Sequence, residues 1–230
     1  MRPAVSIIIP CYNEELRIPK AIQILNAWID AHPFDEVLFS NDGSKDNTIE
    51  QIMNLKKHHQ MKIMESGFNF GKWNAIRKAF FMCTKSYVVL LDADLSVHPR
   101  FIDVYGDMMN GDVLLGDRYG QKGILQVPFS RLITSKVFNL CVRFVVGLKV
   151  RDCQCPFKAF PRNEKMASLF GLIEEKRFSG DVEFIKRAKL MGFQMKFVEV
   201  DYDFKEGSTV SIRKHAWPMF KALWVIRRIR

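Results

Sequence analysis

Two aspartates stand two residues apart at the end of an apolar run near the middle of the chain. The run Tyr87–Leu91 has the composition of a buried β-strand, and Asp92 and Asp94 follow it directly. In an open parallel α/β sheet, ligands bind outside the carboxyl ends of the strands. Carboxylates there suit Mg²⁺ or Mn²⁺, which take one or two of them together with phosphate oxygens of a substrate. The alternative is that the Asp-x-Asp sequence only caps a turn.

Two other strands are also expected to end in polar residues. The apolar strand Val5–Ile9, stopped by Pro10, leads into the sequence CYNE, and the strand Glu36–Ser40 leads into NDGS. If these strands are parallel, their tips converge with the aspartate pair at one edge of the sheet. There Tyr12 offers a ring for stacking on a nucleobase, and Asp42 can accept hydrogen bonds from a base or a ribose. Ordinary strand-to-helix turns remain the alternative.

The elements that position these tips alternate along the first half of the chain. Apolar residues recur at helical spacing from Ile18 to Ile29 and from Ile76 to Cys83, and short strands are expected at Lys62–Glu65 and Val113–Leu115. This alternation predicts a mostly parallel, doubly wound α/β sheet. Neither a Gly-x-Gly-x-x-Gly motif after the first strand nor a Walker-type loop occurs, so a metal ion is expected to hold phosphates. No repeat or linker divides the 230 residues, and a single domain is expected.

The basic charge is concentrated in two apolar segments. Of the net charge of +10, segments 128–151 and 211–230 hold eleven basic residues and no acid, which leaves 24 basic against 25 acidic residues elsewhere. In segment 129–148 apolar residues follow i, i+3, i+4, i+7 spacing, opposite a side with Ser135, Asn139 and Arg143. Such segments favour peripheral, monotopic attachment to an anionic membrane surface over nucleic-acid binding. A core helix is the alternative.

The five cysteines follow no disulfide or zinc spacing, which is typical of a reducing compartment. The cytoplasmic side of a membrane is therefore the expected location. The oligomeric state stays open.

Three motifs of the first half resemble those of family 2 glycosyltransferases with the GT-A fold. They are VSIIIPCYNEE at 5–15, NDGS at 41–44 and DADLS at 92–96. Motifs of the second half narrow the resemblance to polyprenyl-phosphate hexosyltransferases: GDRY at 116–119, SR at 130–131, RDCQCPFKAF at 151–160 and EGS at 206–208. The third of these resembles dolichyl-phosphate glucosyltransferases more than dolichol-phosphate mannose synthases.

The resemblance implies a GT-A fold with a nucleotide-sugar-binding half at 1–120 and an acceptor and membrane-interface half at 121–230. It implies inverting, metal-dependent transfer of a hexose to a polyprenyl or dolichyl phosphate, with UDP-glucose as the first candidate donor. A GDP-mannose donor, a soluble glycan acceptor and a catalytically idle membrane scaffold stay open as alternatives. The implied ligands of Mg²⁺ or Mn²⁺ are Asp92 and Asp94. The implied donor-binding residues are Pro10, Tyr12, Asn13, Glu14, Asp42, Lys72, Asp92, Ala93 and Arg118.

The acceptor chemistry follows from charge. A lipid monophosphate has a second pKa of about 6 and is mostly deprotonated at pH 7, so it needs cationic anchoring more than a general base. Arg118 and Arg131 are the candidate anchors. Asp152 matches the family's acceptor-side motif and would orient the phosphate or act as a weak base, unless it only forms a salt bridge with Arg151 or Arg131. The catalytic candidates are thus Asp152, Asp94 and Arg131, and the acceptor-binding candidates are Arg131, Ser135, Gln154, Lys205 and Ser208.

Overall fold

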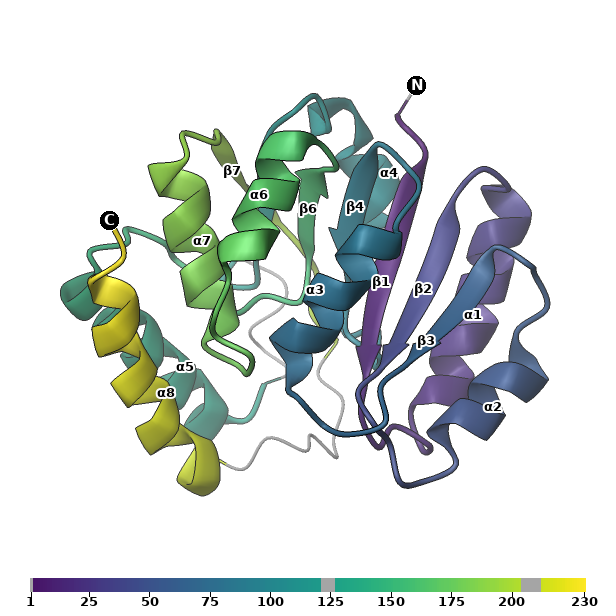
Figure 1. Cartoon of the computed structure of the whole chain (residues 1–230), viewed down its shortest axis with the longest axis horizontal. Coiled ribbons are helices and arrows are strands. Elements are labelled where there is room, and N and C mark those ends of the chain that lie inside the picture. The colour runs from purple at the N-terminus through teal and green to yellow at the C-terminus, as the bar shows by residue number, and fades with distance from the viewer. Residues whose placement is uncertain (1, 121–126, 204–211) are drawn as a thin grey trace.

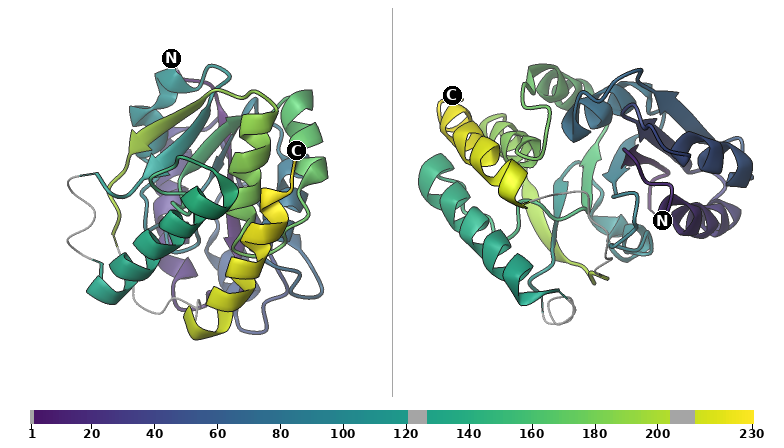
Figure 2. Two further views of the ribbon diagram at one scale, coloured as in Figure 1. Left: turned by 90° about the vertical axis from the view of Figure 1, so that its left-hand side faces the viewer. Right: turned by 90° about the horizontal axis from the view of Figure 1, so that it is seen from below.

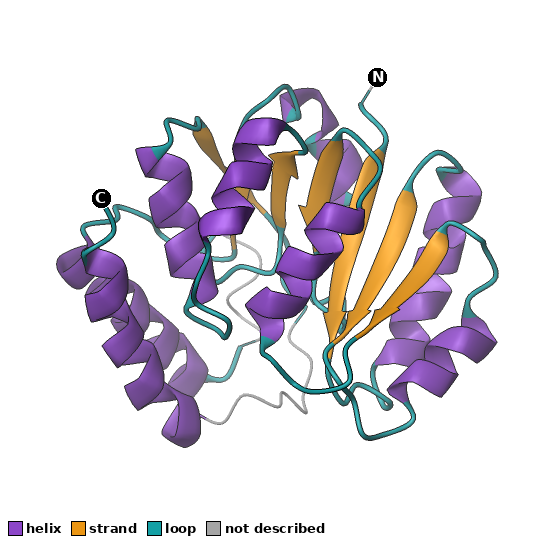
Figure 3. Ribbon diagram, viewed as in Figure 1, coloured by secondary structure: helices purple, strands orange, loops and turns teal. Residues whose placement is uncertain are grey.

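One sheet takes its strands from both halves of the chain. The computed structural model describes residues 2–120, 127–203 and 212–230, with only the backbone of 129–131 and 212–216. In these residues seven strands lie in the order β3-β2-β1-β4-β6-β5-β7 (Figure 1, Figure 3). They are β1 (Val5–Cys11), β2 (Glu36–Asn41), β3 (Met61–Glu65), β4 (Tyr87–Leu90), β5 (Val113–Asp117), β6 (Lys158–Pro161) and β7 (Met195–Glu199).

Helices cover both faces of this sheet. One core packs beneath α1 (Ile18–Ala31), α2 (Thr48–Leu55) and α4 (Phe101–Val104), the last followed by the short η1 (Gly106–Met108). The other core packs beneath α3 (Lys72–Met82), α6 (Glu164–Leu172) and α7 (Gly180–Leu190). Beyond α7, α5 (Phe129–Cys141), the π-helical segment η3 (Val142–Val146) and α8 (Ile212–Arg227) lie side by side (Figure 1, Figure 2).

The first strands are buried on both sides because both faces of the sheet are covered. In β1, Ile7 and Ile9 pack beneath α1, whereas Ile8 packs beneath α3. The predicted doubly wound sheet is confirmed, with β1 to β4 all parallel. The prediction that Pro10 stops the first strand was wrong, since β1 continues to Cys11. The pairing of β1 with β4 ends before Pro10. Proline has no N–H to donate, and it is tolerated there because that side of β1 has no partner strand at this position.

Strand β6 was not predicted, and it breaks the parallel pattern. It runs antiparallel to β4 and β5 and pairs Lys158 with Leu90. The start of β6 therefore lies beside the end of β4. This direction brings the segment before β6, with Asp152, to the carboxyl edge of the sheet.

The segment 129–148, which contains α5 and η3, was expected to be amphipathic, and the structure shows which side faces outward. Ser135 and Asn139 lie on the inner side, and Asn139 is almost fully buried. The exposed fractions of the apolar stripe are 45% for Ile133, 53% for Val137, 50% for Leu140 and 78% for Phe144. A core helix would bury this stripe, so that alternative is wrong for α5. Within the described ranges, no helix combines the length and apolarity needed to cross a bilayer.

Gly180 begins α7 where the helix passes the buried indole of Trp73. A Cβ at position 180 would lie 2.3 Å from Trp73 Cγ. We therefore expect Gly180→Ala to lower the free energy of unfolding by about 1–3 kcal/mol, the usual cost of overpacking, as measured by urea denaturation. Gly171→Ala in α6 is the matched control, because nothing lies within 4 Å of its missing Cβ, and it should be neutral or slightly stabilising. Equal stability of Gly180→Ala and wild type would contradict this packing.

Candidate active site

The C-terminal tips of β1, β2 and β4 meet around one cleft. Strand β1 has β2 on one side and β4 on the other, so the strand order reverses there. A crevice opens at such a reversal because the following connections leave in opposite directions. The cleft, called the tip cleft below, has a volume of about 510 Å³. Of the predicted donor and metal residues, it brings together Pro10, Tyr12, Glu14, Asp42, Lys72, Asp92, Ala93 and Asp94.

The two aspartates after β4 have different surroundings. Lys72 Nζ donates to Asp92 Oδ1 at 2.5 Å. Burial alone would raise the pKa of Asp92, but the Lys72 ammonium outweighs burial and holds that pKa below its usual value. Asp94 accepts a hydrogen bond from the Ser96 N–H, and its Oδ2 lies 3.7 Å from Arg17 Nη1. Burial and the adjacent Asp92 charge raise the pKa of Asp94, so this carboxylate would gain from a further cation.

Asp42 holds the loop before α3. Its carboxylate oxygens accept hydrogen bonds from the N–H groups of Phe70, at 3.0 Å, and Gly71, at 2.7 Å. Gly71 has a φ of +106°, a conformation that residues with side chains rarely adopt. Asp42 therefore shapes the cleft wall, and each oxygen keeps a second lone pair for a ligand.

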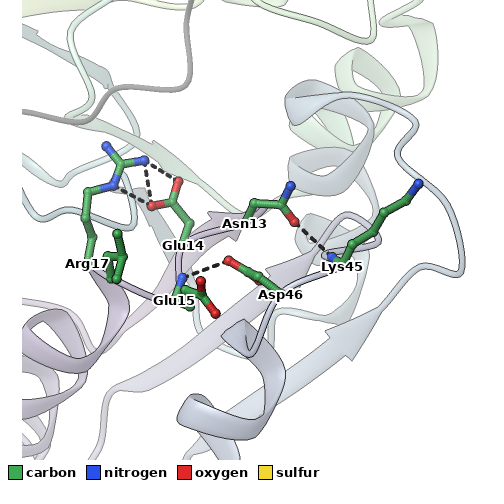
Figure 4. Close-up of a pocket in the computed structure, with 7 residues that line it drawn as sticks. Asn13, Glu14, Glu15, Arg17, Lys45 and Asp46 are labelled. Atoms are coloured by element: carbon green, nitrogen blue, oxygen red, sulfur yellow. Dashed lines mark hydrogen bonds and ion pairs between the residues drawn. The ribbon is translucent and has the colours of Figure 1, made fainter.

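The loops that follow β1 and β2 are tied to each other (Figure 4). The Lys45 N–H donates to Asn13 Oδ1 at 2.8 Å, and the Glu15 N–H donates to Asp46 Oδ2 at 3.1 Å. Asn13 lines a neighbouring pocket and does not line the tip cleft. Its φ of +55° is a strained conformation for a residue with a side chain.

Glu14 and Arg17 line both this neighbouring pocket and the tip cleft. Two hydrogen bonds of 2.7 Å join the Arg17 guanidinium to the Glu14 carboxylate. Burial nevertheless raises the pKa of Glu14 to about 7. The ionised form of Glu14 therefore depends on the cations around it.

Arg118 and Asp152, two predicted site residues, form an ion pair with each other. Arg118 Nε donates to Asp152 Oδ2 at 2.6 Å, and Arg118 Nη2 donates to Asp152 Oδ1 at 2.9 Å. Burial opposes the charge of Arg118, but the Asp152 carboxylate more than offsets burial and raises the pKa of Arg118. The alternative that Asp152 only forms a salt bridge with Arg151 is not what the structure shows, because Arg151 lies 3.9 Å from Asp117 instead. Arg118 also does not line the tip cleft, in contrast to its predicted donor-binding place.

Hydrogen bonds connect α5 to the residues next to this ion pair. Tyr119 Oη and Ser135 Oγ lie 2.5 Å apart, so Ser135 is already engaged within the protein. Asn139 Nδ2 donates to Tyr119 Oη at 3.2 Å, and Asn139 Oδ1 accepts from the Cys153 N–H at 3.2 Å. The Gln154 N–H donates to Asp152 Oδ1 at 3.2 Å. The inner side of α5 thus contacts the chain immediately after both Arg118 and Asp152.

A buried ion pair joins β6 to α7. Lys158 Nζ lies 2.6 Å from Asp181 Oδ1. Asp181 helps to hold the pKa of Lys72 above its usual value, although Asp92 contributes more and burial opposes both. Lys158 in turn helps to lower the pKa of Asp92. Acidic and basic side chains therefore alternate from the tip cleft into the interior.

Three predicted residues lie outside what the structure describes. Lys205 and Ser208 fall within 204–211, and the side chain of Arg131 falls within 129–131. Their acceptor-side roles stay predictions.

Several residues of the tip cleft were not predicted: Arg17, Asn69, Arg177 and Phe178. Arg17 could have been found from its position three residues after Glu14. Asn69 and Gly71 flank Phe70 in the loop that Asp42 holds. Arg177 and Phe178 have no sequence signal that connects them to the strand tips, and only the packing of the loop before α7 brings them there.

The cleft residues fit a divalent metal ion that shares its ligands with a phosphate. Within the described residues, no three His, Cys, Asp or Glu side chains gather into a metal cage. Mg²⁺ needs no such cage where a substrate supplies phosphate oxygens and the protein supplies one or two carboxylates. Asp94 meets this requirement because a cation would offset the burial and the Asp92 charge that raise its pKa.

Comparison with known proteins identifies the family. The model of glycosyl transferase family 2 matches residues 6–163, which is more than half of the chain. The chain belongs to glycosyltransferase family 2. The expected family and the expected enzyme class are thereby confirmed.

Curated relatives match most of this glycosyltransferase. Glycosyltransferase AglD of Haloferax volcanii is 27% identical over 90% of the chain, which spans only 34% of that protein. The dolichyl-phosphate beta-glucosyltransferase ALG5A of Trichomonas vaginalis is 28% identical over 90% of the chain and 68% of that protein. The dolichyl-phosphate beta-glucosyltransferase of Dictyostelium discoideum is 25% identical over 96% of the chain and 73% of that protein.

Solved structures confirm the GT-A fold. Glucosyl-3-phosphoglycerate synthase of Mycobacterium tuberculosis superposes with a TM-score of 0.70 at 15% identity, over 97% of this chain and 78% of that chain. That enzyme was crystallised with Mn²⁺, UDP and glucosyl-3-phosphoglycerate. At this identity the likeness establishes the fold alone.

The ion pair of Arg118 and Asp152 gives a stability prediction. Arg118→Gln would leave the buried Asp152 carboxylate without its cation, so we expect a loss of about 3–5 kcal/mol of unfolding free energy in urea denaturation. Arg151→Gln is the matched control, because Arg151 is exposed and only 3.9 Å from an acid, and it should stay within about 0.5 kcal/mol of wild type. Similar losses of unfolding free energy in the two variants would show that the buried ion pair does not stabilise the fold more than an exposed arginine does.

Proposed function

We propose that this glycosyltransferase moves a hexose from a nucleoside diphosphate sugar to a polyprenyl or dolichyl phosphate at a membrane surface. The proposal depends on two features that occur together: a cleft lined by carboxylates, and the helix α5, whose apolar side is exposed. The names of the relatives support it, since those from Trichomonas vaginalis, Dictyostelium discoideum and Drosophila melanogaster are dolichyl-phosphate beta-glucosyltransferases. UDP-glucose is therefore the first candidate donor, and GDP-mannose is the alternative.

The tip cleft would hold the donor. Tyr12 and Asp42, at the ends of β1 and β2, would contact the nucleoside, with Pro10, Glu14 and Ala93 forming the surrounding wall. Asn13, in the neighbouring pocket, would act by holding the loop after β2. Asp94, with Asp92 beside it, would hold Mg²⁺ or Mn²⁺ against the diphosphate. A bound divalent ion there supplies Lewis-acid stabilisation of the charge on the departing diphosphate. Lys72 neutralises Asp92, which lowers the repulsion that an incoming diphosphate would meet.

The acceptor would need positioning more than deprotonation. An oxygen of the lipid phosphate attacks the anomeric carbon on the side opposite the leaving diphosphate, so the configuration inverts. Because that phosphate is mostly ionised at pH 7, no base has to remove a proton first. Asp152 serves by fixing the direction of Arg118, since acting as a base would require breaking their two hydrogen bonds. Arg131, Ser135, Gln154, Lys205 and Ser208 remain the other proposed acceptor contacts.

The exposed sides of α5, η3 and α8 would face the membrane. Trp217 and Trp224 are exposed on α8, and Lys221 and Arg227 lie over their rings at 5.4 Å. Aromatic rings paired with basic groups suit the headgroup region of a bilayer, where each basic residue contributes about 1 kcal/mol of binding to anionic lipid. We place the enzyme on the cytoplasmic side because its cysteines are free, as in a reducing compartment.

The direct test is transfer of labelled sugar to polyprenyl phosphate in vesicles. UDP-glucose and GDP-mannose are compared with Mg²⁺ or Mn²⁺ present, and a soluble glycan is offered as a second acceptor. Glucosyl lipid from UDP-glucose is the expected product. Transfer only to the glycan would refute the lipid acceptor, and no transfer from any donor would favour the idle scaffold.

Asp94→Asn tests the metal role. Loss of a metal-binding carboxylate should remove several kcal/mol of transition-state stabilisation, and we expect transfer to fall about 100-fold or more. Asp107→Asn, which changes an exposed aspartate in η1, is the control and should keep wild-type activity. Vesicle binding should be the same in both variants. Undiminished transfer by Asp94→Asn would refute the assignment.

Phe144→Glu tests the membrane-facing side. Burying a Phe side chain contributes about 1.5–3 kcal/mol, so its replacement by an acid should weaken flotation with anionic vesicles about tenfold or more. Phe34→Glu is the matched control, because Phe34 is also 78% exposed but lies between α1 and β2. If both variants lose vesicle binding equally, the attachment does not depend on this side.

A further inference from the structure

Arg177 is a cation of the tip cleft for which the described residues offer no counter-charge. In the described part of the chain, three cationic side chains line the cleft: Arg17, Lys72 and Arg177. Arg17 is bound to Glu14, and Lys72 is bound to Asp92. Across the described residues, the Arg177 side chain has neither an ion pair nor a hydrogen bond, although four carboxylates line the same cleft.

The loop that carries Arg177, residues 174–179, is held firmly at its centre. The Lys176 carbonyl accepts hydrogen bonds from the Trp73 N–H at 2.9 Å and the Asn74 N–H at 3.4 Å, at the start of α3. A Cβ on Gly71 would lie 2.3 Å from this carbonyl and 3.1 Å from Arg177 Cγ. The arginine stem therefore passes directly over the glycine whose N–H binds Asp42.

The same loop is also held at its first residues. The buried Glu183 carboxylate accepts hydrogen bonds from the N–H groups of Glu174 and Glu175, and it forms an ion pair with Arg187 at 2.7 Å. Because hydrogen bonds to a charged group are strong, this carboxylate holds the backbone of the loop in place at its first two residues. The loop is thus a fixed support for an arginine whose side chain has no hydrogen-bond or ion-pair partner among the described residues.

A guanidinium without a partner among the described residues, carried by a firmly held loop at a ligand cleft, is suited to bind an anion. Guanidinium groups bind phosphate oxygens in a two-bond geometry, and preorganisation removes much of the entropic cost of that contact. We propose that Arg177 binds the diphosphate of the sugar donor and stabilises the charge that develops when the bond from the anomeric carbon to the diphosphate oxygen breaks. The electron pair of that bond passes to the diphosphate, while an oxygen of the acceptor phosphate forms the new bond to carbon. This inference rests on the proposed function and names one of its donor-binding residues.

The test is the binding of UDP and GDP, measured by calorimetry at a fixed Mn²⁺ concentration. Arg177→Gln should weaken binding of the diphosphate that the wild type prefers by about tenfold or more, because a hydrogen bond to a charged group is lost. Arg177→Lys should recover part of the affinity. Lys176→Gln is the matched control: it removes the same charge from the adjacent position, which does not line the cleft, and should bind like wild type. Thermal unfolding of all variants should be unchanged, because the Arg177 guanidinium has no ion pair or hydrogen bond among the described residues and both replacements keep the aliphatic stem beside Gly71.

The outcomes separate the two proposals. Unchanged diphosphate affinity in Arg177→Gln, with binding in the wild type, would overturn the role of Arg177 and leave the proposed function standing. An unchanged diphosphate affinity together with a raised KM for lipid phosphate would assign Arg177 to the acceptor instead and equally overturn it. A wild type that binds neither diphosphate would overturn both proposals.

Discussion

Repulsion between carboxylates is the constraint on which the site depends. Glu14, Asp42, Asp92 and Asp94 come from three strand tips and share one cleft, mostly out of water. The protein offsets each charge differently: Arg17 for Glu14, backbone N–H groups for Asp42 and Lys72 for Asp92. Asp94 has only the Ser96 N–H and the more distant Arg17 guanidinium, and burial and the Asp92 charge raise its pKa. Asp94 and Arg177 line the same cleft, and a metal-bound diphosphate would contribute a cation for the one and an anion for the other.

The strand tips could be predicted from the sequence because their signal is local. Each consists of a buried strand followed at once by polar residues, and parallel pairing brings such ends to one edge without further information. The partners of these residues could not be predicted, because they depend on packing between distant segments. Arg118 meets Asp152 only because β6 enters the sheet antiparallel beside β4. Likewise, Arg177 reaches the cleft only through the contact of its loop with Gly71.

The α5 helix illustrates a second limit of sequence patterns. Helical spacing separated an apolar stripe from a polar one, but it did not decide which stripe faces the protein. The partners of Asn139 decide it, because Tyr119 and Cys153 offer hydrogen-bonding groups that an apolar stripe would leave unsatisfied in the interior. Turning the helix over would bury Phe144 and Val137 at the expense of those bonds. Exposure of the apolar stripe is thus a consequence of polar groups beneath the helix.

The same hydrogen bonds connect the proposed membrane side to the proposed acceptor side. Asn139 contacts the residue after Arg118 and the residue after Asp152, so a single side chain of α5 fixes both segments that meet in the buried ion pair. A lipid that reaches the enzyme along α5 would arrive beside a guanidinium whose direction is already set. Under the proposed function, the lipid phosphate would meet a guanidinium that the Asp152 carboxylate already holds in place. Such preorganisation would suit the proposed acceptor, because a phosphate that is already ionised needs positioning more than proton removal.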